Sequence, residues 1–98
     1  MATKLLSPVH PGEILREEFM LPLELSSNAL ARAIGVTPAR VNEIANEKRG
    51  ISADTALRLG RYLGTTADVW INLQKRFDLE MARRELGETL DRIKPRAA

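Results

Sequence analysis

The feature that most constrains the fold of this chain is the segment SNALARAIGVTPARVNEIAN, at residues 27–46. Its apolar residues recur at spacings of three and four, which predicts two short helices. Gly35 can adopt the positive φ that ends the first helix, and Thr37 with Pro38 forms an N-cap and first residue for the second. The pattern is typical of a helix-turn-helix, although a helical hairpin that binds no nucleic acid would give a similar one.

Small and aliphatic residues occupy the positions that two crossed helices must bury. Ala31 is small at the point where the second helix would cross the first. The other residues predicted to face inward are Leu30, Ile34, Val41, Ile44 and Ala45. The helical period then turns the opposite side of the second helix outward, with Ala39, Asn42, Glu43 and Asn46 on it and Arg40 at its flank.

The outward side chains suit contacts with base edges. Arg40 can donate two hydrogen bonds to guanine, which discriminates by about 1 to 3 kcal/mol per base pair. Alternatively, it contacts a phosphate or pairs with Glu43 one turn away. Asn42 or Asn46 can read adenine or bridge to the backbone, Glu43 can accept from cytosine, and Ala39 can contact a thymine methyl or simply allow close approach. Lys48 and Arg49 follow where the helix would exit toward phosphate.

Composition favours one all-α domain. The chain has 98 residues, of which 44% are hydrophobic and four are aromatic, and its apolar positions recur at helical rather than alternating spacing. The formal net charge is only +2, but residues 27–50 carry four cations and two acidic residues, whereas residues 1–26 carry two cations and four acidic residues. DNA binding would therefore depend on the local placement of charge.

Three more helices are expected around the motif. Residues 1–9 read as a flexible arm, and a helix from His10 to about Met20 begins a domain that extends to residue 86. Ser26 or Ser27 can cap the first motif helix, and their hydroxyls could instead meet a phosphate. A fourth helix begins after Ser52 and ends at Gly64.

A long fifth helix is predicted from Thr66, with Trp70, Leu73, Phe77 and Met81 at spacings of three and four. The stripe from Trp70 to Phe77 is expected to be core. Residues 87–98 form a C-terminal tail, and Leu86, Leu90 and Ile93 are candidates for a dimer or partner contact if the tail is ordered.

Catalysis is not expected. The only histidine, His10, precedes a proline at a helix start and reads as a capping or surface residue. Glu17 and Glu18 are adjacent, so they diverge on a helix and form a solvated face or a patch for a basic partner. The sequence has no cysteine and no long apolar run. We therefore predict no catalytic residues, no cofactor, no metal site and no membrane association, and we expect a cytoplasmic protein.

Three segments together resemble the HigA-type antitoxins, also called VapI-like, of the Cro and lambda-repressor-like helix-turn-helix group. They are HPGEILREEF at residues 10–19, RVNEIANEKRGIS at 40–52 and DTALRLGRYLGT at 54–65, and WINLQ at 70–74 extends the likeness. The resemblance implies a five-helix fold and a homodimer that binds a palindromic operator in its own promoter. It also implies a partner toxin of the HigB type, a ribosome-dependent mRNA endonuclease.

The resemblance places the recognition helix at residues 37–46, which adds Thr37 to the base-reading set. It places phosphate contacts at Ser27, Asn28, Lys48 and Arg49. Glu47 stands where such proteins usually have glycine, and Pro38 with Ala39 replaces a polar pair found in many phage repressors. The operator sequence therefore does not transfer, and two alternatives stay open: a repressor without a toxin, and a protein-interaction module whose motif contacts no DNA.

Overall fold

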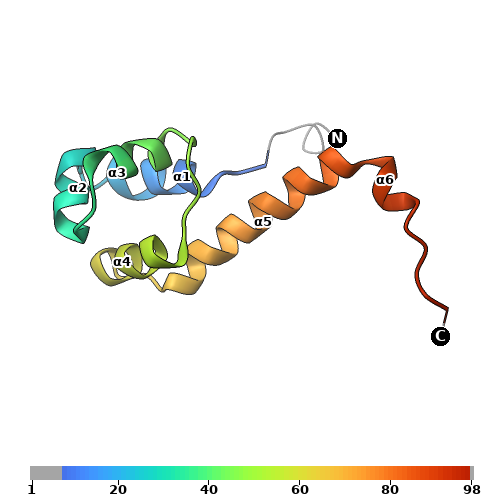
Figure 1. Cartoon of the computed structure of the whole chain (residues 1–98). Coiled ribbons are helices and arrows are strands. Elements are labelled where there is room, and N and C mark those ends of the chain that lie inside the picture. The colour runs from blue at the N-terminus through green and yellow to red at the C-terminus, as the bar shows by residue number, and fades with distance from the viewer. Residues whose placement is uncertain (1–7, 98) are drawn as a thin grey trace.

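The computed structural model describes residues 8–97, and every regular element in that range is helical. The elements are α1 (Pro11–Ile14), η2 (Leu15–Met20), α2 (Ser27–Ile34), α3 (Pro38–Ala45), α4 (Ala53–Leu63), α5 (Ala67–Leu86) and α6 (Glu88–Asp91) (Figure 1). α1 continues directly into η2, which has π-helical hydrogen bonding. The five predicted helices, including the long fifth one, are confirmed, and α6 is added. The predicted arm at residues 1–9 lies mostly outside the described residues.

Helix boundaries follow the predicted capping chemistry. The side-chain oxygens of Ser26, Thr37, Ser52 and Thr66 each accept a backbone N–H three residues later, at 3.0, 3.2, 3.3 and 3.3 Å. Gly35 caps the C-terminal end of α2 with φ 75°, and Gly64 caps that of α4 with φ 77°, the left-handed conformation that favours glycine. Local sequence therefore sets where the motif helices begin and end.

The core lies between the first helical segment, the motif, α4 and the start of α5. Its buried residues are Leu15, Met20, Leu30, Ala31, Ile34, Val41, Ile44, Ala45, Ile51, Ala56, Leu59 and Trp70. Trp70 is fully buried, its ring centroid lies 5.4 Å from that of Phe19, and its Nε1 donates to Thr65 Oγ1 at 2.8 Å. All the predicted inward residues of the motif are buried, so the core holds α3 in a fixed orientation.

The first helical segment packs directly on α3. His10 caps α1, and its Nδ1 accepts the Gly12 N–H at 2.8 Å. The imidazole is buried and meets the Phe77 ring edge-on at 4.8 Å, so the capping interpretation is confirmed and the surface alternative is wrong, because α5 covers the ring. The missing side chain of Gly12 lets α1 approach the Ile44 carbonyl near the end of α3.

The second half of α5 projects beyond the helical body, as Figure 1 shows, and the chain measures 52 × 32 × 21 Å. Trp70 is core, Leu73 packs against the core and Phe77 contacts His10, so the predicted stripe is confirmed to Phe77. α5 ends at Leu86, and Gly87, whose φ is 49°, breaks the helix before α6. Leu86, Leu90 and Ile93, the last predicted contact residues, are 43%, 44% and 66% exposed.

Candidate nucleic-acid interface

The N-terminal ends of α2 and α3 meet at one side of the molecule. They border an open hollow of about 230 Å³. Its lining residues are Ser26, Ser27, Asn28, Pro38, Ala39 and Asn42. The Ser27 hydroxyl lies 3.3 Å from Asn42 Oδ1 as a hydrogen-bond donor, which links the two helices. Two helix N-termini bring unpaired N–H groups and partial positive charge to the same side.

α3 has one buried and one exposed face, as predicted from the helical period. Val41, Ile44 and Ala45 are buried, whereas the outward set consists of exposed and half-exposed residues. Its members are Thr37, Ala39, Arg40, Asn42, Glu43 and Asn46. The Thr37 oxygen already accepts the Arg40 N–H, so its hydroxyl hydrogen is the group left for a further contact. The orientation is thereby confirmed, and the base contacts of these side chains stay a prediction.

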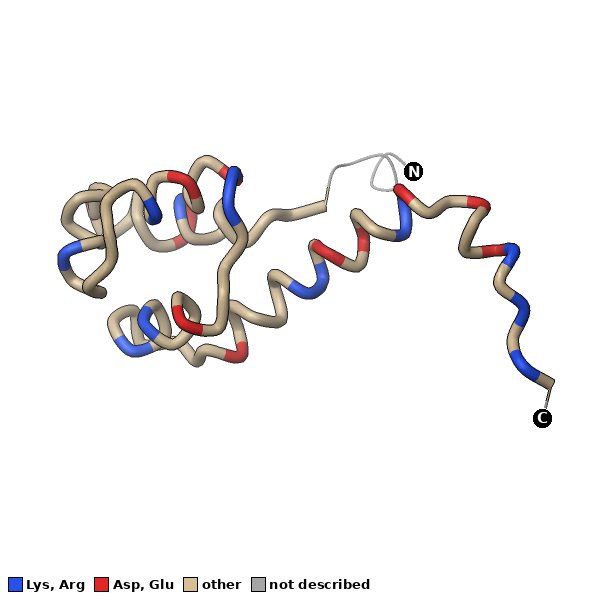
Figure 2. The backbone as a smooth tube through the Cα atoms, viewed as in Figure 1, with Lys and Arg blue, Asp and Glu red and all other residues tan. Residues whose placement is uncertain are grey.

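The charged residues at the end of α3 pair with one another. Arg49 Nε donates to Glu43 Oε1 at 2.8 Å, and both side chains are about half exposed. This pair offsets the negative charge that Glu43 would otherwise present to a phosphate. Lys48 is exposed beside it and supplies a cation where the chain leaves α3, and Figure 2 shows basic residues at this point of the chain. Of the predicted phosphate contacts, Ser27 and Asn28 lie at the start of α2, beyond the other end of α3.

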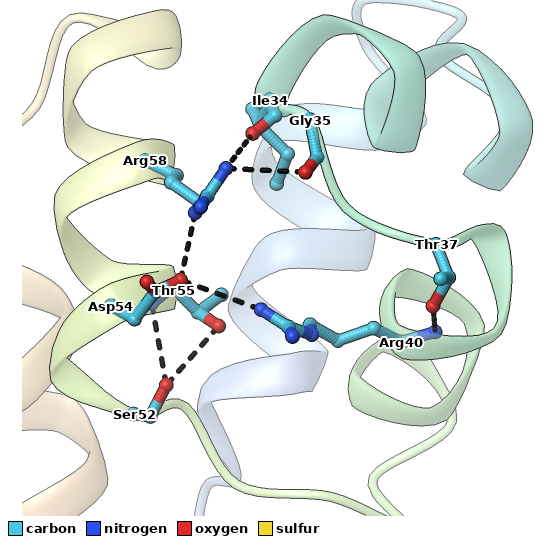
Figure 3. A network of polar contacts seen from close by, with 8 residues as sticks. All are labelled: Ile34, Gly35, Thr37, Arg40, Ser52, Asp54, Thr55 and Arg58. Atoms are coloured by element: carbon cyan, nitrogen blue, oxygen red, sulfur yellow. Dashed lines mark hydrogen bonds and ion pairs between the residues drawn. The ribbon is translucent and has the colours of Figure 1, made fainter.

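Arg40 belongs to a polar network that joins α3, α4 and the end of α2 (Figure 3). Its Nη1 lies 3.4 Å from Asp54 Oδ1, and Arg58 Nε donates to the same oxygen at 2.7 Å. Arg58 Nη1 also donates to the carbonyls of Ile34 and Gly35 at 2.8 and 3.2 Å. The hydrogen bond from Arg58, with the charges of both arginines, lowers the pKa of Asp54. Arg40 therefore pairs with Asp54, whereas Glu43 pairs with Arg49.

Sequence reasoning missed this network. It assigned no contact to Asp54 or to Arg58. The i, i+4 spacing of these two residues was a signal for their ion pair. Their contacts to α2 and α3 join residues 14 to 24 positions apart in the chain, and no spacing in the sequence predicts those.

Arg16 is a second missed residue. Its Nη1 donates to the Ala45 carbonyl at the end of α3, and the guanidinium lies 3.4 Å from Glu47 Oε2. The hydrogen bonds that Arg16 donates to the carboxylates, chiefly to Glu17 and then to Glu47, raise the pKa of Arg16. Glu47 has φ 63°, a left-handed conformation, at the position where the proteins that this sequence resembles usually have glycine. The first helical segment therefore caps the predicted recognition helix.

Residues 8–97 include no group of three or more His, Cys, Asp or Glu residues placed to hold a metal ion. Over the same residues, every helix is too short or too polar to cross a membrane. The hollow at the start of α2 and α3 and the exposed face of α3 form the candidate site.

The capped α2, the glycine turn and the half-exposed α3 define a helix-turn-helix, and a family model described as helix-turn-helix matches residues 15–70. Virulence-associated protein I of Dichelobacter nodosus is 57% identical over 77 residues, which cover 79% of this chain and 71% of that protein. Antitoxin HigA-1 of Vibrio cholerae is 36% identical over 88 residues, with 90% and 83% covered. The structure of Pseudomonas aeruginosa antitoxin HigA with the higBA promoter has a TM-score of 0.88 and 48% identity, covering 92% of this chain and 99% of that one. The chain belongs to the HigA-type antitoxin family.

Proposed function

We propose that this chain is a sequence-specific transcriptional repressor and the antitoxin of a type II toxin–antitoxin module. It binds its own operator as a homodimer and neutralises a HigB-type mRNA endonuclease. Its action on DNA places it in the cytoplasm. The observation that carries the proposal is the exposed polar face of α3 beside the capped start of α2, in a chain that matches nearly the whole of an antitoxin solved with promoter DNA.

The residues divide by the kind of contact they offer. Thr37, Ala39, Arg40, Asn42, Glu43 and Asn46 face outward from α3 and are assigned to base edges. Ser27, Asn28, Lys48 and Arg49 flank α3 and are assigned to phosphates, which position the protein without reading sequence. Arg49 can serve in this way when it exchanges Glu43 for a phosphate, because an exposed ion pair contributes only about 0.2 to 1 kcal/mol.

A salt-dependent gel shift on the DNA upstream of the gene tests the proposal. Wild-type protein should bind one site more tightly than scrambled DNA. Arg40→Ala should relax base preference at one position, at a cost of about 1 to 3 kcal/mol. Lys48→Ala should weaken binding to all sequences and lower the salt slope by about one, because one phosphate contact is lost.

Lys75→Ala is the matched control, since Lys75 is an exposed lysine on α5 rather than near the end of α3. It should leave the salt slope unchanged. Equal affinity of wild-type protein for operator and scrambled DNA at low salt would contradict the repressor proposal. The protein-interaction module would then be the better interpretation of the fold.

Dimerisation follows from the limited reach of one helix. A single recognition helix reads only a few base pairs, and two copies would bind half-sites about 34 Å apart. Leu86, Leu90 and Ile93 are assigned to this contact because they are exposed apolar residues at the projecting end of the chain. Sedimentation should show a dimer that Leu90→Glu dissociates. Leu21→Glu, a matched change at a leucine 62% exposed near the other end of the chain, should keep it.

Toxin binding is tested with the product of an adjoining gene. A HigB-type toxin should co-purify with the chain, and adding it should change the affinity of the chain for its operator. The coupling must be reciprocal, so operator DNA should change toxin affinity by the same factor. Operator affinity that does not depend on toxin would remove the coupling. The absence of any toxin partner would leave a stand-alone repressor.

A further inference from the structure

A polar network surrounds Asp54 at the flank of α3. It consists of Arg40 on α3, Asp54 and Arg58 on α4, and the carbonyl oxygens of Ile34 and Gly35 at the end of α2 (Figure 3). It therefore joins both helices of the motif to the helix that follows them. Only one of its side chains, Arg40, belongs to the proposed base-reading set.

Arg58 is the fixed member of this network. Its guanidinium makes three hydrogen bonds: Nε to Asp54 at 2.7 Å, and Nη1 to the carbonyls of Ile34 and Gly35 at 2.8 and 3.2 Å. The two carbonyls lie at the C-terminal end of α2, where the helix dipole favours a cation. A planar guanidinium held by three acceptors loses most of its rotational freedom, so Arg58 holds Asp54 at a defined place.

Asp54 is in turn set in position to accept Arg40. It is the second residue of α4, where a negative charge is favourable, and its Oδ1 receives Arg58 Nε at 2.7 Å and Arg40 Nη1 at 3.4 Å. The longer of these contacts is the weaker one. It uses one of the five N–H donors of Arg40 and leaves four for another acceptor.

We infer that Asp54, held by Arg58, is a positioning residue that directs the Arg40 guanidinium toward a base edge and away from the phosphate backbone. This inference rests on the proposed function. The carboxylate lowers the entropy that Arg40 loses when it makes a two-bonded contact with a base. Its negative charge also repels phosphates. Asp54 therefore favours binding to the operator, where Arg40 contacts a base, over binding to other sequences, where Arg40 could contact only phosphates.

The test is the ratio of affinities for operator and scrambled DNA, measured by fluorescence anisotropy over a series of salt concentrations. Asp54→Asn removes the charge and keeps the size of the side chain. We expect the ratio to fall by about fivefold, the upper range for one exposed ion pair. Binding to scrambled DNA should tighten, with a salt slope steeper by about one, because Arg40 becomes available to a phosphate.

Asp68→Asn is a matched control. Asp68 is also the second residue of a helix, in the sequence Thr66-Ala67-Asp68, which parallels Ser52-Ala53-Asp54. The structure of residues 8–97 shows no ion pair for it. The change removes the same charge at the same helical position, so it corrects for the general loss of one negative charge, and we expect an unchanged ratio.

A double-mutant cycle separates positioning from a structural role. In an Arg40→Ala background, Asp54→Asn should no longer change the operator ratio, whereas a general effect on α4 would persist there. Thermal unfolding of each variant verifies that it is folded. An unchanged ratio in Asp54→Asn, with specific binding by wild-type protein, would overturn this inference alone. Failure of wild-type protein to bind specifically would overturn the proposed function and the inference with it.

Discussion

Gly12 controls how closely the first helical segment approaches α3, and Gly12→Ala tests that contact. A Cβ built at Gly12 would lie against the Ile44 carbonyl oxygen, closer than real Cβ atoms approach any atom, and 2.9 and 3.0 Å from the Ile44 carbonyl carbon and His10 Nδ1. The obstacle is the backbone of a buried residue, so it cannot be relieved by a side-chain rotation. α1 and α3 would have to separate by about 1 Å.

The expected cost follows from the kind of atoms that must move. Overpacking a well-packed interior costs about 1 to 3 kcal/mol, and a rigid backbone obstacle places this case at the upper end. Alanine is a better helix former than glycine by about 1 kcal/mol, and part of this difference offsets the cost of overpacking. We expect the free energy of unfolding to fall by about 2 kcal/mol. In a domain of this size that lowers Tm by about 8 to 16 °C.

Urea and thermal unfolding followed by circular dichroism measure this loss. Gly60→Ala is the comparison, because Gly60 lies inside α4 and its added Cβ would be 3.0 Å from Ala67 N and the Thr66 carbonyl carbon, a much smaller conflict. Its loss should be below about 1 kcal/mol, since a shift of a few tenths of an ångström suffices and helix propensity improves. Equal stability of the two variants would refute the argument that Gly12 fixes the distance between α1 and α3.

Two further predictions concern caps. Thr37→Ala removes the acceptor for the Arg40 N–H and should lower the free energy of unfolding by about 1 kcal/mol in urea titrations, and a change below about 0.3 kcal/mol would contradict the capping role. Burial lowers the pKa of His10 from 6.5, an effect that Glu47 and Asp78 partly offset. The unfolded chain therefore takes up the proton first, so stability should fall as the pH drops from about 7.5 through 6.5 and should level off below the folded pKa. His10→Asn keeps a capping acceptor but does not titrate in this range, so urea unfolding between these pH values should show a flatter dependence, and a slope equal to that of wild-type protein would exclude His10 as its source.

The sequence was most informative about local structure. Ser52, Thr37 and Gly35 act as caps because their effect depends on hydrogen bonds and backbone angles within a few residues, which the order of residues specifies directly. The two faces of α3 follow from the same logic, since the helical period alone separates Val41 and Ile44 from the outward set. The motif and its exposed face could therefore be predicted from the sequence alone.

The partners of the charged residues could not be predicted in this way. Arg40 had one possible partner within its own helix, Glu43, but the packing of α4 against the motif brings Asp54 to it instead. Glu43 then pairs with Arg49 across the turn that ends α3. Long, flexible charged side chains can reach several possible partners. The partner that each one contacts depends on how the separate helices pack against one another.

The sequence by itself determined the five predicted helices, the caps of the motif helices, the buried face of the motif and the family resemblance, because each depends on short-range hydrogen bonding or on a periodic pattern. Only the tertiary structure decided that Arg16 caps α3, that Gly12 lies against Ile44, and that Asp54 forms an ion pair with Arg40. These contacts join residues 14 to 32 positions apart, and they form only after burial of the apolar faces has fixed the distances between helices.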